Sequence, residues 1–136
     1  MMSKSAIDSN VLVYLFDASD ERKRLITETL LVQKPIISSQ VISEYLNVSK
    51  RLLKLPKNEI LAKANQVFER CEIMPVNQST MNLALFLLKK YDFQLFDSVI
   101  VASALESECP ILYSEDLQHN QLIENRLRVI NPFLQP

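Results

Sequence analysis

The chain alternates between short apolar runs and longer segments in which apolar positions recur every three or four residues. The short runs are typical of buried strands, whereas the three-to-four-residue spacing is typical of amphipathic helices. The pattern predicts strands over residues 5–7, 35–37, 72–76, 110–113 and 128–130, and helices over 11–16, 21–32, 38 or 39 to about 53, 57–70, 79–91 and 96–106, with a short helix near Gln121.

Strands that alternate with helices predict an α/β fold, a central parallel sheet covered by helices on both faces. A length of 136 residues is usual for one domain, and 48% hydrophobic residues can fill its core, so we expect a single domain over residues 1–136. In such sheets functional side chains gather outside the carboxyl ends of the strands. Polar residues follow three of the predicted strands at that edge: Asp8, then Ser38 and Ser39, then Ser114, Glu115 and Asp116.

The composition excludes several classes of site. The chain has no glycine, and loops that cradle nucleotide phosphates need it, so we expect no nucleotide cofactor. The single histidine, His119, cannot supply the ligands of a common zinc site, and we interpret it as an ordinary loop residue. Cys71 and Cys109 fit neither a disulfide framework nor a zinc motif, which predicts buried thiols in a reducing compartment.

The charge and hydropathy of the chain limit its partners. A net charge of −1 excludes a protein that coats nucleic acid, although basic clusters remain at residues 22–24 and at Lys50 and Arg51. No apolar stretch is long enough to cross a membrane, and the amino terminus does not resemble a secretory leader. We therefore expect a soluble, cytoplasmic protein without membrane contacts.

Two acidic residues stand at positions that demand an explanation. Asp8 lies between a predicted strand and a helix, where it either caps the helix or belongs to a site, with Asn10 as a second polar group. Asp97 begins a helix that is apolar around nearly its whole circumference. A buried, unpaired carboxylate is costly, so Asp97 needs a cation or the helix amino terminus nearby.

Glu44 and Asp116 are ambiguous when taken alone. Glu44 lies at the border of an apolar helix stripe and is either solvated or part of a site, and Asp116 is either a turn residue or a ligand. However, four acids from distant segments are predicted to meet at one sheet edge, where their charges repel unless a cation is present. Oxygen ligands without histidine or cysteine favour Mg²⁺ or Mn²⁺.

Four motifs, in order, carry a resemblance to a known family. They are residues 7–14 (IDSNVLVY), 38–45 (SSQVISEY), 96–100 (FDSVI) and 111–117 (ILYSEDL). With these motifs the chain resembles the PIN domain family, and within it the VapC-like ribonuclease toxins of bacterial toxin–antitoxin pairs. The resemblance covers nearly the whole chain.

The resemblance implies a fold, an acidic site and partners. The fold is a three-layer α/β/α sandwich with strand order 3-2-1-4-5, commonly dimeric and inhibited by an antitoxin peptide across the active site. Family members often carry glycine near the positions of Asp92, Glu108 and Asn120; aspartate and asparagine tolerate left-handed backbone, whereas Glu108 is less suited to it. The implied catalytic residues are Asp8, Glu44, Asp97 and Asp116, with Ser9 or Ser114 as a supporting hydroxyl.

The resulting hypothesis is a metal-dependent endoribonuclease. In it, Asp8, Asp97 and Asp116 hold one or two Mg²⁺ or Mn²⁺ ions, which activate water and neutralise the phosphate, while Glu44 completes the shell or orients a water. Aspartyl phosphotransfer is disfavoured because Asn10 stands where such phosphatases have a second acid. A processing nuclease without an antitoxin and a catalytically inactive binding module remain the alternatives.

The partners expected from this hypothesis are RNA, a cognate antitoxin and a second copy of the chain. Three basic residues are candidates to hold the RNA backbone, although such charges usually serve only as a solvated helix face. They are Lys50, Arg51 and Lys54.

Overall fold

A computed structural model describes residues 4–51 and 53–134, and a single sheet forms the centre of this part of the chain. The strand order is β3-β2-β1-β4-β6-β5, and all neighbours are parallel except β5 and β6, which are antiparallel. Because β6 is the fifth strand predicted from the sequence, the expected order 3-2-1-4-5 is confirmed. The strands are β1 (Ala6–Ile7), β2 (Ile36–Ser38), β3 (Glu72–Met74), β4 (Ile111–Tyr113), β5 (Leu122–Ile123) and β6 (Leu127–Ile130).

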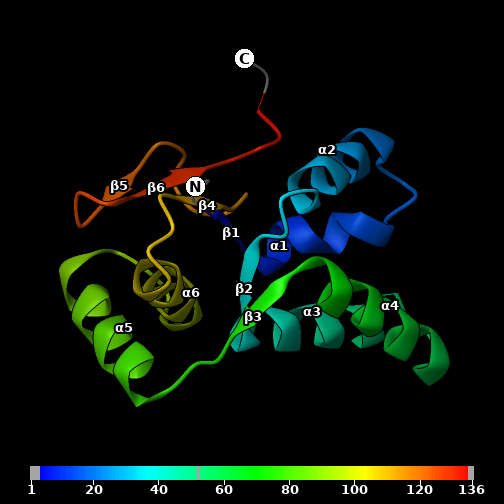
Figure 1. Cartoon of the computed structure of the whole chain (residues 1–136), viewed down its shortest axis with the longest axis horizontal. Coiled ribbons are helices and arrows are strands. Elements are labelled where there is room, and N and C mark those ends of the chain that lie inside the picture. Colours follow the sequence, from blue (N-terminus) through cyan, green and yellow to red (C-terminus); the bar gives the residue numbers. More distant parts are fainter. Residues whose placement is uncertain (1–3, 52, 135–136) are drawn as a thin grey trace.

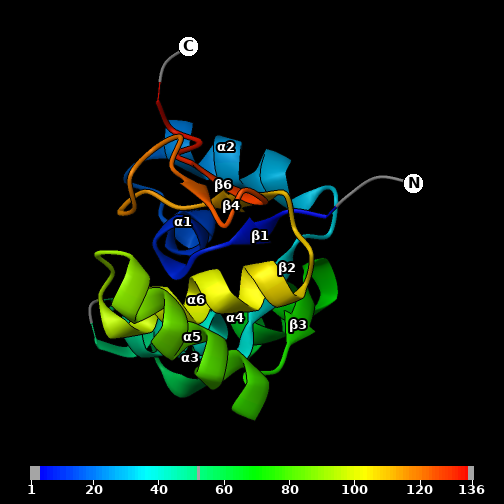
Figure 2. The same cartoon turned by 90° about the vertical axis from the view of Figure 1, so that its left-hand side faces the viewer.

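Helices cover both faces of the sheet and make the predicted three-layer α/β/α arrangement. Figure 2 shows α2 on one side of β1 and β4, and α5 with α6 on the other, while Figure 1 places α3 and α4 beside β2 and β3. The helices are α1 (Ser9–Leu12), the 3₁₀ helix η1 (Val13–Phe16), α2 (Glu21–Leu31), α3 (Ser39–Arg51), α4 (Lys57–Arg70), α5 (Gln78–Lys90) and α6 (Leu95–Glu106).

The helix α6 lies in the middle of the core, as its apolar sequence predicted. Every residue from Ser98 to Leu105 is buried, and α6 packs against β2, β4, α3 and α5. The central strands are equally hidden, with Ile7 at 1% and Leu112 at 0% exposure. This packing fixes the first turn of α6, where Asp97 stands, against the edge of the sheet.

The two cysteines are buried free thiols, as predicted. Burial raises the pKa of both Cys71 and Cys109 to about 11, so they remain protonated at neutral pH. His119 is an exposed residue of the turn after β4, and its Nδ1 accepts a hydrogen bond from the backbone N–H of Asn131. This contact agrees with its interpretation as a loop residue.

The short helix predicted near Gln121 is wrong. The chain there forms β5, which returns to β6 through a tight turn with positive φ at Glu124 (52°) and Asn125 (56°). Consecutive left-handed residues give the twist that joins antiparallel strands, and this local geometry overrides the helical pattern. The predicted third helix also ends at Arg51 rather than near residue 53, because Lys54 turns the chain with a φ of 52°; Leu52 lies outside the described residues.

Two of the three positions at which family members often carry glycine adopt left-handed backbone here. They are Glu108, with a φ of 58°, and Asn120, with a φ of 69°. Asp92 is not among the positive-φ residues of the described chain. The C-cap residue of α5, Tyr91, is already extended, so the chain leaves the helix without a left-handed residue at Asp92. The chain thus places even a glutamate in the less favourable conformation at Glu108.

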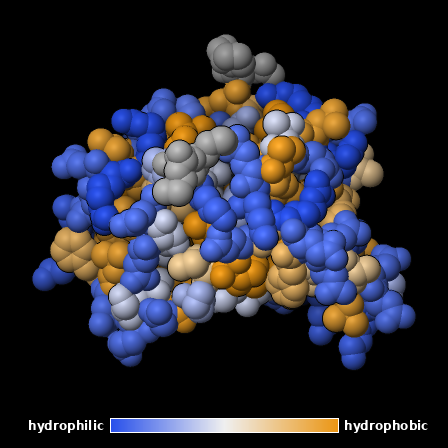
Figure 3. Space-filling model, viewed as in Figure 1, coloured by the Kyte–Doolittle hydropathy of each residue, from blue (hydrophilic) through white to orange (hydrophobic). Residues whose placement is uncertain are grey.

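The surface mixes hydrophilic side chains with separate apolar ones (Figure 3). Exposed apolar residues include Leu61 and Phe68 on α4 and Leu85 and Phe86 on α5. Within residues 4–51 and 53–134, no helix combines the length and the apolar character that crossing a membrane requires.

Candidate active site

Asp8 stands at the carboxyl end of β1 and is held by both the sheet and a helix. Its backbone N–H donates to the carbonyl of Tyr113 in β4 at 2.9 Å, and its side chain is only 2% exposed. Its Oδ1 accepts the backbone N–H of Ser9 at 2.7 Å, so Asp8 is also the N-cap of α1. The sequence alternatives of cap and site residue therefore do not exclude one another.

The second carboxylate oxygen of Asp8 receives two side-chain donors. Ser114 Oγ donates to Oδ2 at 2.9 Å and Asn10 Nδ2 at 3.2 Å, while Asn10 Nδ2 also lies 3.3 Å from Ser114 Oγ. Asn10 Oδ1 accepts the backbone N–H of Glu115 at 3.0 Å. Asn10 and Ser114 thus connect α1 to the loop after β4 and orient Asp8.

Glu44 is joined to Asp8 through the hydroxyl of Ser9. Ser9 Oγ donates to Glu44 Oε2 at 2.9 Å and lies 3.4 Å from Asp8 Oδ1. Gln40 Nε2 donates to Glu44 Oε1 at 3.0 Å, one helical turn away on α3. Gln40 was not predicted from the sequence, although its spacing of four residues from Glu44 is one at which helix side chains meet.

Asp97 lies in the first turn of α6 and does not act as its cap. The N-cap is Gln94, which makes no side-chain capping bond, and within the described chain no hydrogen bond or ion pair of the Asp97 carboxylate is found. The pKa of Asp97 is raised, first by partial burial and then by the charges of Glu44 and Asp116. These couplings bring acids from three separate segments into one electrostatic cluster.

Asp116 is exposed in the bend after β4 and forms the open side of this cluster. Together with Asp97 it lines a cavity of about 320 Å³, large enough to admit water and a phosphate-sized group. The other lining residues are Asp92, Phe93, Gln94, Leu117, Gln118 and Gln121.

The charges of the four acids are not compensated by basic side chains. Of the ion pairs among residues 4–51 and 53–134, none involves Asp8, Glu44, Asp97 or Asp116. Burial first, and then the charges of Asp97 and Glu44, raise the pKa of Asp8 to about 6, against the lowering effect of hydrogen bonds from Ser114 and Ser9. An acidic cluster without a cation favours the binding of one.

The chemistry of the donors fits a hard divalent cation, since carboxylate, hydroxyl and amide oxygens surround the site. The spacing sets a limit on how it is held. In the described part of the chain, no three His, Cys, Asp or Glu side chains come together closely enough to be recognised as a shared metal site. Mg²⁺ commonly keeps several waters among its ligands and binds few carboxylates directly.

The structure does not bring the predicted basic residues to the acids. Lys50, Arg51 and Lys54 are exposed at the end of α3 and just beyond it. Lys50 lines a separate cavity of about 430 Å³ with Leu55, Lys57, Ile60 and Leu61, and none of the four acids lines it. A role of these residues in holding RNA stays a prediction.

Solved structures share this fold at low sequence identity. A chain of a toxin–antitoxin complex from Klebsiella pneumoniae is 20% identical, with a TM-score of 0.71, covering 96% of this chain and 98% of that one. VapC20 of Mycobacterium tuberculosis, described as a sarcin–ricin loop cleaving toxin, is 18% identical, with a TM-score of 0.67 and coverage of 83% and 90%. VapBC2 of Rickettsia felis, solved with promoter DNA, is 18% identical, with a TM-score of 0.68 and coverage of 93% and 98%.

A search of curated protein sequences finds no match. The family model named PIN domain, in contrast, matches residues 6–124. The matched region contains all four acids as well as Ser9, Asn10 and Ser114. On this match, and in agreement with its sheet order, the chain belongs to the PIN domain family.

Proposed function

We propose that this chain is a metal-dependent endoribonuclease and the toxin of a toxin–antitoxin pair. The observation that carries the proposal is the electrostatic coupling of four acids at the carboxyl edge of the sheet, none of which forms an ion pair with a basic side chain within residues 4–51 and 53–134. PIN domain nucleases generally use divalent metal ions, and the PIN fold supports a nuclease activity.

The acids are assigned complementary roles. Asp8, Asp97 and Asp116 would hold Mg²⁺ or Mn²⁺ directly or through water, and Glu44 would complete the shell or orient a water. The cation would supply an acidified water and would neutralise charge on the phosphate oxygens. Ser114 and Asn10 orient Asp8, because both donate to its Oδ2, and the hydrogen bond from Ser114 lowers the pKa of Asp8 against the effect of burial.

The exposure of the acids suits a substrate that approaches from the side of Asp116. Asp8 is buried, Glu44 and Asp97 are partly buried and Asp116 is exposed, so the cluster is most accessible at Asp116. A flexible single strand can enter such a cavity with its phosphate, and RNA is the substrate that we assign. Lys50, Arg51 and Lys54 are our candidates to hold the adjoining backbone.

The partners that we assign are an antitoxin and a second copy of the chain, in the cytoplasm. Several similar structures are described as toxin–antitoxin complexes, among them those from Klebsiella pneumoniae and Rickettsia felis. Exposed apolar side chains such as Phe68, Leu85 and Phe86 offer surface for protein contacts.

The test is cleavage of a labelled, unstructured RNA by the purified chain in Mg²⁺ or Mn²⁺ and after chelation. We expect cleavage only with metal, and loss of it in Asp8→Asn and Asp97→Asn. Asp17→Asn is the matched control, because within the described chain the carboxylate of Asp17 bonds only to Ser19, in its own turn. Cleavage that survives in Asp8→Asn, or equal activity with EDTA, would contradict the proposal; equal cleavage of single-stranded DNA would contradict its restriction to RNA.

A further inference from the structure

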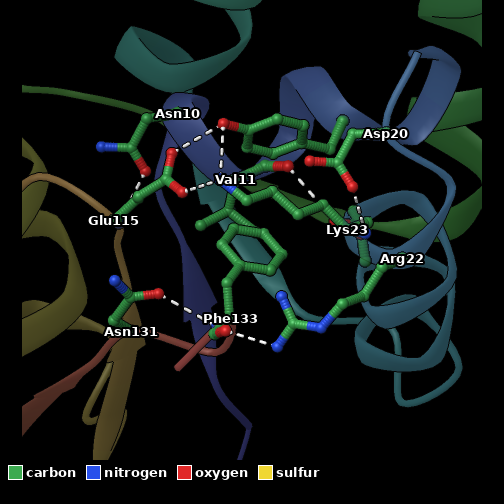
Figure 4. A network of polar contacts seen from close by, with 10 residues as sticks. Asn10, Val11, Asp20, Arg22, Lys23, Glu115, Asn131 and Phe133 are labelled. Carbon is green, nitrogen blue, oxygen red and sulfur yellow. Dashed lines mark hydrogen bonds and ion pairs between the residues drawn. The ribbon is translucent and has the colours of Figure 1, made fainter. Parts of the chain in front are cut away.

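Glu115 is an acid of the site loop that serves a different purpose from its neighbours. It lies between Ser114, which binds Asp8, and Asp116, which lines the cavity. Its own carboxylate is held by two residues outside the acid cluster: Tyr14 Oη donates to Oε1 at 2.8 Å, and Lys23 Nζ forms an ion pair with Oε2 (Figure 4). We call Tyr14, Lys23 and Glu115 the loop clamp.

The loop clamp is partly shielded from water. The side chains of Lys23 and Glu115 are each only 24% exposed. Lys23 Nζ lies 4.7 Å from the ring centre of Tyr14 and 5.1 Å from that of Phe133, and it donates to Tyr14 Oη at 3.2 Å. An ion pair covered by aromatic rings is less screened than a surface pair, and both rings favour the cation.

The chain after β6 forms one wall of the loop clamp. The rings of Phe133 and Tyr14 meet edge to face with centres 5.1 Å apart. The carbonyl of Phe133 accepts a hydrogen bond from Arg22 on α2, and its N–H donates to Asn131 Oδ1 at 3.0 Å (Figure 4). These bonds fix the position of Phe133 over Lys23, so the three segments of the loop clamp are packed against a fourth segment of the chain.

A short path connects the loop clamp to Asp8. The backbone N–H of Glu115 donates to Asn10 Oδ1, and Asn10 Nδ2 donates to Asp8 Oδ2. The side chain and the backbone of Glu115 are thus both anchored, which leaves the loop little freedom to rotate. Ser114 and Asp116, one residue to either side, must follow the position of Glu115.

We propose that Tyr14 and Lys23 are positioning residues that hold Glu115 and thereby set Ser114 and Asp116 at the proper distance from Asp8. The inference rests on the proposed function for its effect on activity, while the anchoring of the loop stands on the contacts alone. Among the described residues neither side chain has a hydrogen bond or ion pair with Asp8, Glu44, Asp97 or Asp116, so both act through Glu115.

Two variants and one rescue test the loop clamp. Lys23→Met removes the cation but keeps an apolar stem under Phe133, and Tyr14→Phe removes only the hydroxyl and keeps the ring. Lys23→Arg retains the charge. Lys4→Met is the matched control, because it breaks the ion pair between Lys4 and Glu72. Lys4 precedes β1 and Glu72 begins β3, so this pair lies at the amino ends of the strands, whereas the acids lie at the carboxyl ends.

Activity and loop anchoring are measured separately. Because misplaced groups slow chemistry more than binding, we expect Lys23→Met to lower kcat by about ten- to a hundredfold, with KM for RNA changed by less than about threefold. Hydrogen exchange of the Glu115 amide, followed by NMR on each folded variant, is expected to speed up about tenfold or more. Lys23→Arg should keep kcat and the exchange rate of the Glu115 amide close to the wild-type values, and Lys4→Met should change neither quantity.

The outcomes separate the two proposals. If the wild type cleaves RNA and Lys23→Met and Tyr14→Phe match it in kcat, or if both keep the wild-type exchange rate at Glu115, the positioning role is wrong. If the wild type does not cleave RNA, the proposed function fails, and the exchange rates alone then decide whether the loop clamp anchors Glu115. A loss of melting temperature with unchanged kcat would show a purely structural role.

Discussion

Replacing Asp8 by asparagine should stabilise the metal-free protein at neutral pH while it removes activity. In the folded protein the pKa of Asp8 is raised to about 6 from 3.8, chiefly by burial. The folded state therefore holds this proton more tightly than the unfolded chain does. Ionisation of Asp8 therefore lowers the free energy of unfolding, and this loss develops as the pH rises from about 4 through about 6.

The size of the effect follows from the two pKa values. The difference between 3.8 and about 6 corresponds to about 3 kcal/mol of unfavourable free energy once Asp8 is ionised in both states. Asparagine avoids this cost, but its amide nitrogen would oppose Asn10 Nδ2, which now donates to Asp8 Oδ2. The loss of that bond offsets about 1 kcal/mol, so Asp8→Asn should be about 2 kcal/mol more stable at pH 7.5.

The assay is urea unfolding of the wild type and Asp8→Asn in EDTA at several pH values between 4 and 8. The stability of the variant relative to the wild type should rise by about 3 kcal/mol over this range, and Mg²⁺ should stabilise the wild type but not Asp8→Asn. Asp17→Asn serves as the control for an aspartate outside the cluster. A stability difference that does not depend on pH, or a variant that is less stable than the wild type at pH 7.5, would refute the reasoning.

Three further predictions concern the same cluster. RNA cleavage at low Mg²⁺ should increase as the pH rises through about 6, because Asp8 must be ionised. The midpoint of this increase should move to lower pH at higher Mg²⁺ concentration, because the proton and the cation compete for the site. Profiles of cleavage rate against pH at several Mg²⁺ concentrations test both results. Ser114→Ala removes a hydrogen bond that lowers the pKa of Asp8, so the midpoint of the same profile should move to higher pH, and an unchanged midpoint would contradict this. Gln40→Ala frees Glu44 Oε1 and should slow single-turnover cleavage about fivefold, as expected for one hydrogen bond; Gln78→Ala, which breaks a similar helical pair with Asn82, should have no effect.

The fold could be predicted wherever hydrophobic periodicity alone determines the element. The helix from Lys57 to Arg70 has the predicted bounds, and the apolar sequence around α6 correctly indicated a helix buried on all sides. The two-residue strand β5 could not be predicted, because it exists only through its pairing with β6 and the left-handed turn at Glu124 and Asn125. A strand defined by tertiary pairing leaves almost no periodic signal.

The acidic site shows the same division between local and long-range information. Asp8 and Ser114 were expected at strand ends, and the sheet register brings them together, since β1 pairs with β4 in parallel. The adjacent acids Glu115 and Asp116 look equivalent in the sequence but have different surroundings. Which of them faces the cavity depends on Lys23 and Tyr14, which lie about a hundred residues earlier in α2 and η1.

This dependence has a physical consequence for the site. Lys23 pairs with Glu115, whereas Asp116 has no basic partner among the described residues. The charge of Asp116 raises the pKa of Asp97, as does that of Glu44, and repulsion among such acids favours a divalent cation. On our proposal, the pairing of Glu115 with Lys23 leaves Asp116 as the one of these two adjacent acids that is available to a cation.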